Sequence, residues 1–146
     1  MGKTCRVKTG KSPALTITRI GFQADELVYI AKANKRFKYP HGQSSAIAYI
    51  GTTKNGVARI ASSAAYKAKD ILAEHGITHL EFFVVTAQRK RKVNTPRKLE
   101  RALLLRFREY FGSVPIGNKH GKKLTWQDEL EYFSYAKLDK ILDAYE

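Results

Sequence analysis

In this chain of 146 residues, the order of the apolar runs is the feature that most limits the possible folds. Three runs have the length and the β-forming composition of strands, at 27–33, 46–50 and 78–87. Two longer stretches repeat apolar residues at spacings of three and four, which predicts amphipathic helices over about 56–75 and about 95–111. The order strand, strand, helix, strand, helix predicts an α/β (α+β) fold with a small, mainly antiparallel three-stranded sheet flanked by helices.

Capping and turn-forming residues mark the ends of these elements. Gly51 is expected to end the second strand, and Thr95-Pro96 suits the cap and first position of the second helix. The segment 34–45 has Pro40-His41-Gly42 at its middle, which predicts a loop or a hairpin tip.

A helical extension is expected at the C-terminus. Thr125 and Asp128 have the spacing of a capping box, which predicts one or two acidic amphipathic helices from there onward. No repeat, low-complexity tract or linker separates this part from the rest. We therefore predict a single domain over 1–146, with a core at 27–118 and an acidic helical tail at 125–146.

Charge is the strongest global signal. The chain has 27 Lys and Arg against 13 Asp and Glu, and because residues 125–146 are net acidic, at −4, the first 124 residues carry +18. Such a field concentrates polyanions, which indicates a nucleic-acid partner. A membrane is the weaker alternative, because no basic amphipathic anchor with a bulky aromatic face and no long apolar run is present. A basic protein kept soluble by its charge is the simplest alternative.

Cysteine content bounds the chemistry further. The single cysteine, Cys5, can form neither an internal disulfide nor a multi-cysteine zinc cage. The first residues also lack the apolar stretch of a signal peptide. We therefore expect a cytoplasmic, intracellular protein.

One carboxylate stands out within the second predicted helix. Glu100 falls on the same helical stripe as apolar residues three, four, seven and eleven positions later, namely Leu103, Leu104, Phe107 and Phe111. A carboxylate there is costly unless a cation compensates its charge. The alternative is that Glu100 lies at the surface, where it complements the helix dipole or pairs with Arg97.

Four separated features together resemble the GIY-YIG nuclease family. They are Tyr29 in LVY, Tyr49 in YIG, an arginine, Arg59, eight residues after Gly51, and Glu100 near the start of a later helix. The resemblance covers about 27–118, and YIGTTKNGVARI is its most specific part. The long separation of Tyr29 from Tyr49 is similar to that in the compact restriction-endonuclease branch, where inserted loops help to contact DNA.

The resemblance implies a nuclease fold in a bacterial or phage-like cell, and it also implies supporting positions. Asn118 in PIGN sits where the family commonly has an asparagine. The chain departs from the pattern in two places, because LVY lacks the glycine of the first motif and Ser63 stands where some members have His or Tyr. Tyr66 is one turn further along. The expected supporting residues are Gly51, Lys54, Ser63, Tyr66 and Asn118.

The residue types themselves suit phosphodiester hydrolysis. Glu100 would bind one Mg²⁺ or Mn²⁺, hard cations that can take a single protein carboxylate and keep several waters. Arg59 offers a permanently charged planar fork to phosphate oxygens. Tyr29 or Tyr49 would orient or deprotonate the attacking water if a cationic, metal-containing cleft lowered its pKa, and the resemblance favours Tyr29. The alternatives are core packing for the two phenols and a solvated helix face for Arg59.

Contacts with DNA are expected from three cationic segments. Lysine and arginine side chains position a duplex through its phosphates without reading its sequence. Single charge runs are usually solvated loops, and three runs are harder to explain in that way. The residues are Lys32, Lys35, Arg36 and Lys38; Arg89, Lys90, Arg91 and Lys92; and Lys119, Lys122 and Lys123.

The expected function is a divalent-metal-dependent DNA endonuclease, of restriction or defence type. One such site cuts one strand at a time, so a double-strand break needs two copies, and the acidic C-terminal helices are a candidate homodimer surface. The competing hypothesis is a non-catalytic basic nucleic-acid-binding protein, ribosome-associated or architectural. Charge alone does not distinguish duplex DNA from RNA.

Overall fold

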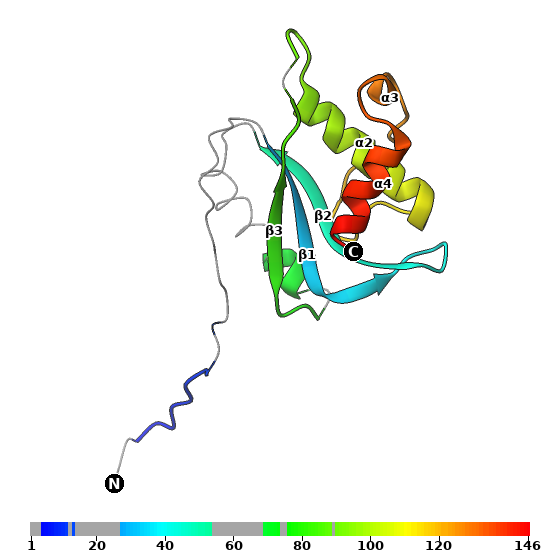
Figure 1. Ribbon diagram of the computed structural model, residues 1–146. Coiled ribbons are helices and arrows are strands. Elements are labelled where there is room, and N and C mark those ends of the chain that lie inside the picture. The colour runs from blue at the N-terminus through cyan, green and yellow to red at the C-terminus, as the bar shows by residue number, and fades with distance from the viewer. Residues whose placement is uncertain (1–3, 12, 14–26, 54–68, 74–75, 89) are drawn as a thin grey trace.

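The computed structural model describes residues 4–11, 13, 27–53, 69–73, 76–88 and 90–146. Within these residues the chain forms one antiparallel sheet of three strands, β1 (Leu27–Lys38), β2 (Ser44–Thr53) and β3 (Leu80–Val85). The strand order is β2-β1-β3, so β1 lies in the centre, as Figure 1 shows. The predicted α+β class and the small antiparallel sheet are confirmed.

The β1–β2 hairpin is longer than the sequence indicated. Most of the segment expected to be a loop is strand, because Phe37 and Tyr39 are buried and carry the core outward along the hairpin. Only the tip turns, where Tyr39 N donates to Gln43 O at 2.8 Å and Gly42 takes φ +90°. The pairing register shifts around Lys32, as at a β-bulge.

Gly51 does not end its strand as expected. It lies inside β2, paired with Tyr29 of β1, and the strand continues to Thr53. Backbone pairing with β1 holds this glycine in an extended conformation, since its ladder partners on both sides continue.

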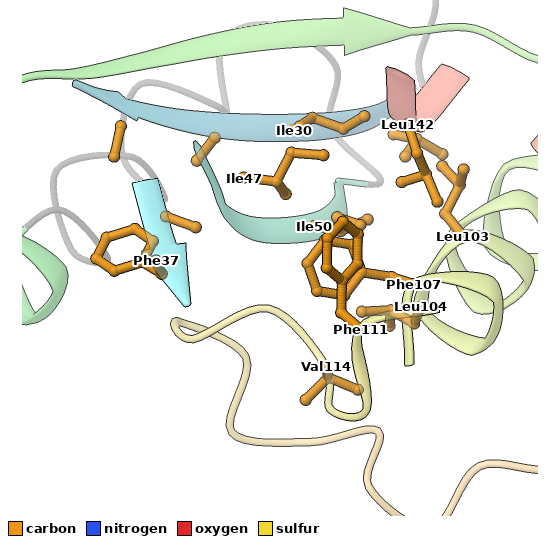
Figure 2. Close-up of a cluster of buried hydrophobic side chains, with 14 of the residues drawn as sticks. Ile30, Phe37, Ile47, Ile50, Leu103, Leu104, Phe107, Phe111, Val114 and Leu142 are labelled. Carbon is orange, nitrogen blue, oxygen red and sulfur yellow. The ribbon is translucent and has the colours of Figure 1, made fainter. Parts of the chain in front are cut away.

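Helix α2 (Thr95–Phe111) packs its apolar stripe on β1 and β2. Its cap is Asn94, whose side chain accepts from Arg97 N at 3.2 Å, so the expected cap at Thr95 is one residue too late. Gly112 ends the helix with φ +90°, the left-handed conformation usual after a helix. Figure 2 shows Phe107 and Phe111 of α2 directed toward Ile50 and Ile47 of β2.

The C-terminal residues form two short helices, α3 (Glu129–Tyr132) and α4 (Tyr135–Ala144), which lie beside α2 in Figure 1. Leu138 and Leu142 of α4 are buried in the main core. The expected capping box at Thr125 is wrong, because the Asp128 side chain makes no cap hydrogen bond and pairs with Lys98 of α2 instead.

Part of the predicted fold lies outside the described residues. Of the helix expected over 56–75, residues 69–73 are helical, and Ile71 is buried in the core. In the described part of the chain, no helix is long and apolar enough to cross a membrane.

Candidate active site

Two phenols meet on one face of the sheet. Strand side chains alternate between the two faces of the sheet. Val28 and Ile30 face α2 and the main core, so Tyr29 between them lies on the other face. Tyr29 pairs with Gly51 across the ladder, and Tyr49 is the diagonal neighbour. Their ring centroids are 5.7 Å apart and stacked, and their hydroxyls share a hydrogen bond. Tyr29 is 3% exposed, whereas Tyr49 is half-buried.

Gly51 provides the space in which these phenols meet. A Cβ atom at this position would lie 2.6 Å from Cε1 of Tyr49 and 2.8 Å from both Cζ and the hydroxyl oxygen of Tyr29. No side chain can be accommodated at such distances unless the rings move. The glycine of the YIG tripeptide is therefore required by ring packing rather than by a turn.

Replacing Gly51 with alanine is expected to separate the two phenols. Because Tyr29 is held between Tyr49 and Phe82, the rings cannot move without disturbing the sheet face, and overpacking of this kind typically costs about 1–3 kcal/mol. Chemical denaturation would measure the loss, and the near-ultraviolet circular dichroism of the tyrosines should change. The comparison is Gly42→Ala, where no atom lies within 4 Å of the new Cβ; it should lose about 1 kcal/mol through its positive φ but leave the near-ultraviolet signal of the tyrosines unchanged. An alanine at 51 with wild-type stability would contradict this account.

Glu100 belongs to α2, which packs on the face of the sheet opposite to that of Tyr29. Its carboxylate accepts a hydrogen bond from the Thr52 side chain, and it lies close enough to both phenols for its charge to raise their pKa values. The structure places Tyr29 and Tyr49 against each other, and the charge of Glu100 is the weakest of the effects on either phenol. Thr52 was missed as a partner, although its position directly after Gly51 places it on the α2 face, opposite Val28.

The ionised form of Glu100 is unfavourable in the folded protein. Burial raises the pKa of the Glu100 carboxyl above its ordinary value, and the hydrogen bond from Thr52 and the charges of Arg97 and Arg101 only partly oppose this. Arg97 precedes Glu100 on α2, and Arg101 follows it directly. The ionised carboxylate is thus destabilised in the folded protein, and a cation beside it would relieve that cost.

The two phenols differ in how readily they ionise. We expected a cationic cleft to lower a phenol pKa, but burial raises the pKa of both Tyr29 and Tyr49 in the protein alone. The hydrogen bond between them adds to the rise for Tyr29 and reduces it for Tyr49. Tyr49, which is also the more exposed ring, is therefore the easier of the two to deprotonate.

Asn118 acts through the backbone of β2. Its amide nitrogen donates to Ile50 O at 2.8 Å, and its side-chain oxygen accepts from Ile50 N at 3.0 Å. Gly117 N donates to Ala48 O at 2.7 Å, so the segment 115–118 runs along the outer edge of β2. Asn118 thus fixes the residue between Tyr49 and Gly51, and it supports the site without facing it.

The oxygen atoms of the site suit a hard divalent cation. Glu100 supplies one carboxylate and Thr52, Tyr29 and Tyr49 supply hydroxyls, and none of these donors is the nitrogen or sulfur that zinc or copper prefers. Among the described residues, no group of three or more His, Cys, Asp or Glu side chains gathers at one place. One carboxylate beside hydroxyl groups is the kind of oxygen donor that Mg²⁺ or Mn²⁺ accepts, and the other ligands of such an ion would have to come from outside these residues.

The expected cationic segments occupy three parts of the described chain. Lys35, Arg36 and Lys38 are exposed on the long hairpin, where Arg36 donates to Ser44 Oγ at 3.1 Å and to Ser44 O at 2.7 Å, whereas Lys32 is half-buried. A second set, Lys90, Arg91 and Lys92, is exposed just before α2. The third set consists of Lys119, Lys122 and Lys123, and all three side chains are exposed. Nζ of Lys119 lies 3.8 Å from Oδ2 of Asp70.

The acidic tail pairs with α2 of the same chain. Glu129, which is 1% exposed, accepts from Arg101 Nε at 2.8 Å, and Asp139 accepts from both Nε and a terminal nitrogen of Arg106 at 2.7 and 3.0 Å. Several of the acids considered for a homodimer surface are therefore engaged within the chain.

Five predicted residues lie outside the described part of the chain, namely Arg59, Lys54, Ser63, Tyr66 and Arg89. Comparisons with protein-family models, with curated proteins and with solved structures find no significant match to this chain. The choice of a function therefore depends on the chemistry of the residues described above.

Proposed function

We propose that this chain is a divalent-metal-dependent DNA endonuclease, of restriction or defence type, that resembles the GIY-YIG nucleases. One observation supports this most. A partly buried carboxylate on α2, Glu100, has a raised pKa and lies within electrostatic range of two hydrogen-bonded phenols on β1 and β2, in a protein whose first 124 residues carry a strong positive charge. A purely structural role would not favour leaving a carboxylate with a raised pKa in an apolar stripe.

Each residue has a task in hydrolysing a phosphodiester. Glu100, which accepts a hydrogen bond from Thr52, would hold the cation, and the cation would supply positive charge to stabilise the transition state. Arg59 neutralises a non-bridging phosphate oxygen. With Tyr49 in its phenolate form, its own proton lost to solvent, water attacks phosphorus and gives its proton to that phenolate, the bond from phosphorus to the 3′ oxygen breaks, and that oxygen takes a proton from solvent. Tyr49 is the half-exposed phenol, and Tyr29 hydrogen-bonds behind it.

The competing function is binding without catalysis. A ribosome-associated or architectural protein would also carry a large positive charge, and an RNA substrate would be attracted equally well. Neither alternative gives a reason for a carboxylate with a raised pKa within electrostatic range of Tyr29 and Tyr49. The nuclease accounts for both the charge and the cluster.

Incubation with supercoiled plasmid tests the proposal. With Mg²⁺ or Mn²⁺ we expect open-circle product first, because one site cuts one strand, and a chelator should stop the reaction. Arg59→Ala should slow cutting by roughly 10²–10³-fold through lost transition-state stabilisation, and Tyr49→Phe by roughly 10²-fold or more through lost proton transfer. Lys140→Ala, at an exposed position on α4, is the matched control and should cut normally.

The opposite result is equally clear. Tight binding to DNA without any cutting, across several duplex substrates and both metals, would favour the non-catalytic binder. Cutting confined to RNA would keep the chemistry and change the substrate. Light scattering of the protein alone and on DNA would show whether a homodimer forms, and a monomer in both cases would remove the double-strand mechanism.

A further inference from the structure

A compact cationic turn precedes helix α2. Lys90 and Val93 form an antiparallel bridge, and Val93 N donates to Lys90 O at 3.2 Å, which closes a four-residue turn. Lys90, Arg91 and Lys92 are all exposed on it. In Figure 1 this connection projects beyond the end of β3 and the start of α2. We call residues 90–93 the cationic turn.

Lys92 has an unfavourable backbone conformation. Its φ is +62°, and it is the one residue other than glycine with a positive φ among the described residues. In a turn where only the third residue has positive φ, glycine or asparagine is usual, because a Cβ atom crowds the following carbonyl oxygen. A lysine here therefore costs stability that a glycine would not.

Two costs are present together in the cationic turn. The backbone of Lys92 is strained, and three adjacent cations, Lys90, Arg91 and Lys92, repel one another in the free protein. Strained residues of this kind are found at sites where the surrounding structure holds them for a function. Binding of a polyanion would remove the repulsion and use the charges, whereas a solvated loop would have no use for either feature.

The base of the cationic turn is attached firmly to α2. Thr95, which is 2% exposed, donates from its hydroxyl to Gln88 O at 2.9 Å and from its backbone N–H to Val93 O at 3.0 Å. Asn94 caps the helix through Arg97 N. Glu100 lies only five residues after the helix start, about 8 Å along the axis at 1.5 Å per residue. The turn and the catalytic carboxylate are therefore carried by one rigid support.

We propose that the cationic turn is a preset binding element for the phosphate backbone of duplex DNA, with Lys92 held in its left-handed conformation so that it contacts the strand presented to Glu100. This assignment rests on the proposed nuclease function. Contacts of this kind add affinity that is independent of sequence and falls steeply with salt. The turn would fix where a strand lies relative to the site, while base reading, if required, falls to other segments.

Lys92→Gly separates binding from folding, because glycine relieves the strain and removes the charge. Binding to a short fluorescent DNA duplex, measured by anisotropy without metal so that no cutting occurs, should weaken by about 5–10-fold at low salt. The slope of log K against log salt concentration should fall by about one. The thermal midpoint should stay the same or rise. Lys92→Arg should keep the wild-type slope.

The controls make each outcome informative. Lys140→Ala removes one charge from an exposed position on α4 and should leave the slope unchanged. Lys92→Asn, which also tolerates positive φ, repeats the test if the glycine variant folds poorly. The assignment is overturned if Lys92→Gly keeps wild-type affinity and slope, if Lys140→Ala loses as much affinity, or if only RNA binding weakens. Weakened duplex binding in a protein that never cuts would leave the turn assigned and remove the nuclease.

Discussion

Glu100→Gln is expected to reduce plasmid cutting by roughly 10²–10³-fold, the loss typical when one group acting on transition-state charge is removed, while making the protein more stable. Glutamine keeps the size of the side chain and an oxygen that can accept from Thr52, but it does not bind a hard cation as a carboxylate does. It also removes the charge whose pKa burial raises. Activity and stability should therefore change in opposite directions.

The stability change should depend on pH with a definite sign. Because the folded-state pKa of Glu100 is raised, the protonated side chain contributes stability that is fully present below the ordinary glutamate pKa and is lost as pH rises through the folded-state pKa. Wild type and Glu100→Gln should have equal thermal midpoints in acid. At neutral pH the variant should melt higher, by about 2–4 °C if the difference is near 1 kcal/mol.

Glu131→Gln is the matched control, because Glu131 is an exposed glutamate on α3. Its cutting rate should equal that of wild type. Differential scanning calorimetry from pH 4 to 8 and a plasmid assay on the same preparations would supply both readouts. A Glu100→Gln protein that cuts at the wild-type rate would remove Glu100 from the chemistry, and one that melts lower at neutral pH would contradict the electrostatic account.

The largest effect on stability is expected at the pair between α2 and α3. Glu129 is 1% exposed, and its oxygens accept from Arg101 Nε at 2.8 Å and from the backbone N–H of Gln127 at 2.7 Å. Arg101 also donates to Thr125 O at 3.0 Å. Arg101→Ala would leave a buried carboxylate without its cation, and such losses cost about 3–5 kcal/mol. Urea denaturation would measure the change.

A double variant distinguishes the pair from simple packing. Arg101→Met with Glu129→Leu replaces both charges by apolar groups of similar size, and buried pairs replaced in this way usually lose little or gain stability. We expect most of the loss in Arg101→Ala to be absent from the double variant. Lys98→Ala breaks the more exposed pair with Asp128 and should cost much less. A double variant as unstable as Arg101→Ala would show that the charges themselves are required.

Acid should weaken the same pair. Burial alone would raise the pKa of Glu129, but the hydrogen bonds from Arg101 and from the Gln127 backbone outweigh it, so the pKa is lowered. A lowered folded-state pKa contributes stability that is present above the ordinary glutamate pKa and is lost as pH falls through the folded value. Glu100 and Glu129 therefore shift stability in opposite directions with pH.

Sequence patterns predicted the elements well where apolar periodicity was strong. The three strands and α2 follow from such runs, and Glu100 was found because a carboxylate interrupted one. Local signals were less reliable. The spacing of Thr125 and Asp128 suggested a cap, but a lysine thirty positions earlier, Lys98, takes the carboxylate in the folded chain. Competition of this kind depends on tertiary contacts that no local window contains.

The site itself was only partly predictable. The resemblance to the GIY-YIG nucleases implied that Tyr29, Tyr49 and Glu100 would meet, but nothing in the sequence indicated that Gly51 makes room for the rings or that Thr52 binds the carboxylate. Both depend on the register of β1 with β2, which fixes the face that each side chain occupies. The pair of Arg101 with Glu129 was also missed, because residues so far apart become neighbours only after the tail folds back.

The Asn118 side chain has a consequence for how copies of this protein meet. Sheet margins with open N–H and C=O groups invite strands from other molecules, and that is a common route to aggregation. Along the outer margin of β2, the carboxamide of Asn118 and the amide of Gly117 already satisfy Ile50 and Ala48. A foreign strand would have to displace both of these contacts, so at Ile50 and Ala48 the margin of β2 is closed to β-addition, and close approach of two copies does not lead to strand pairing there.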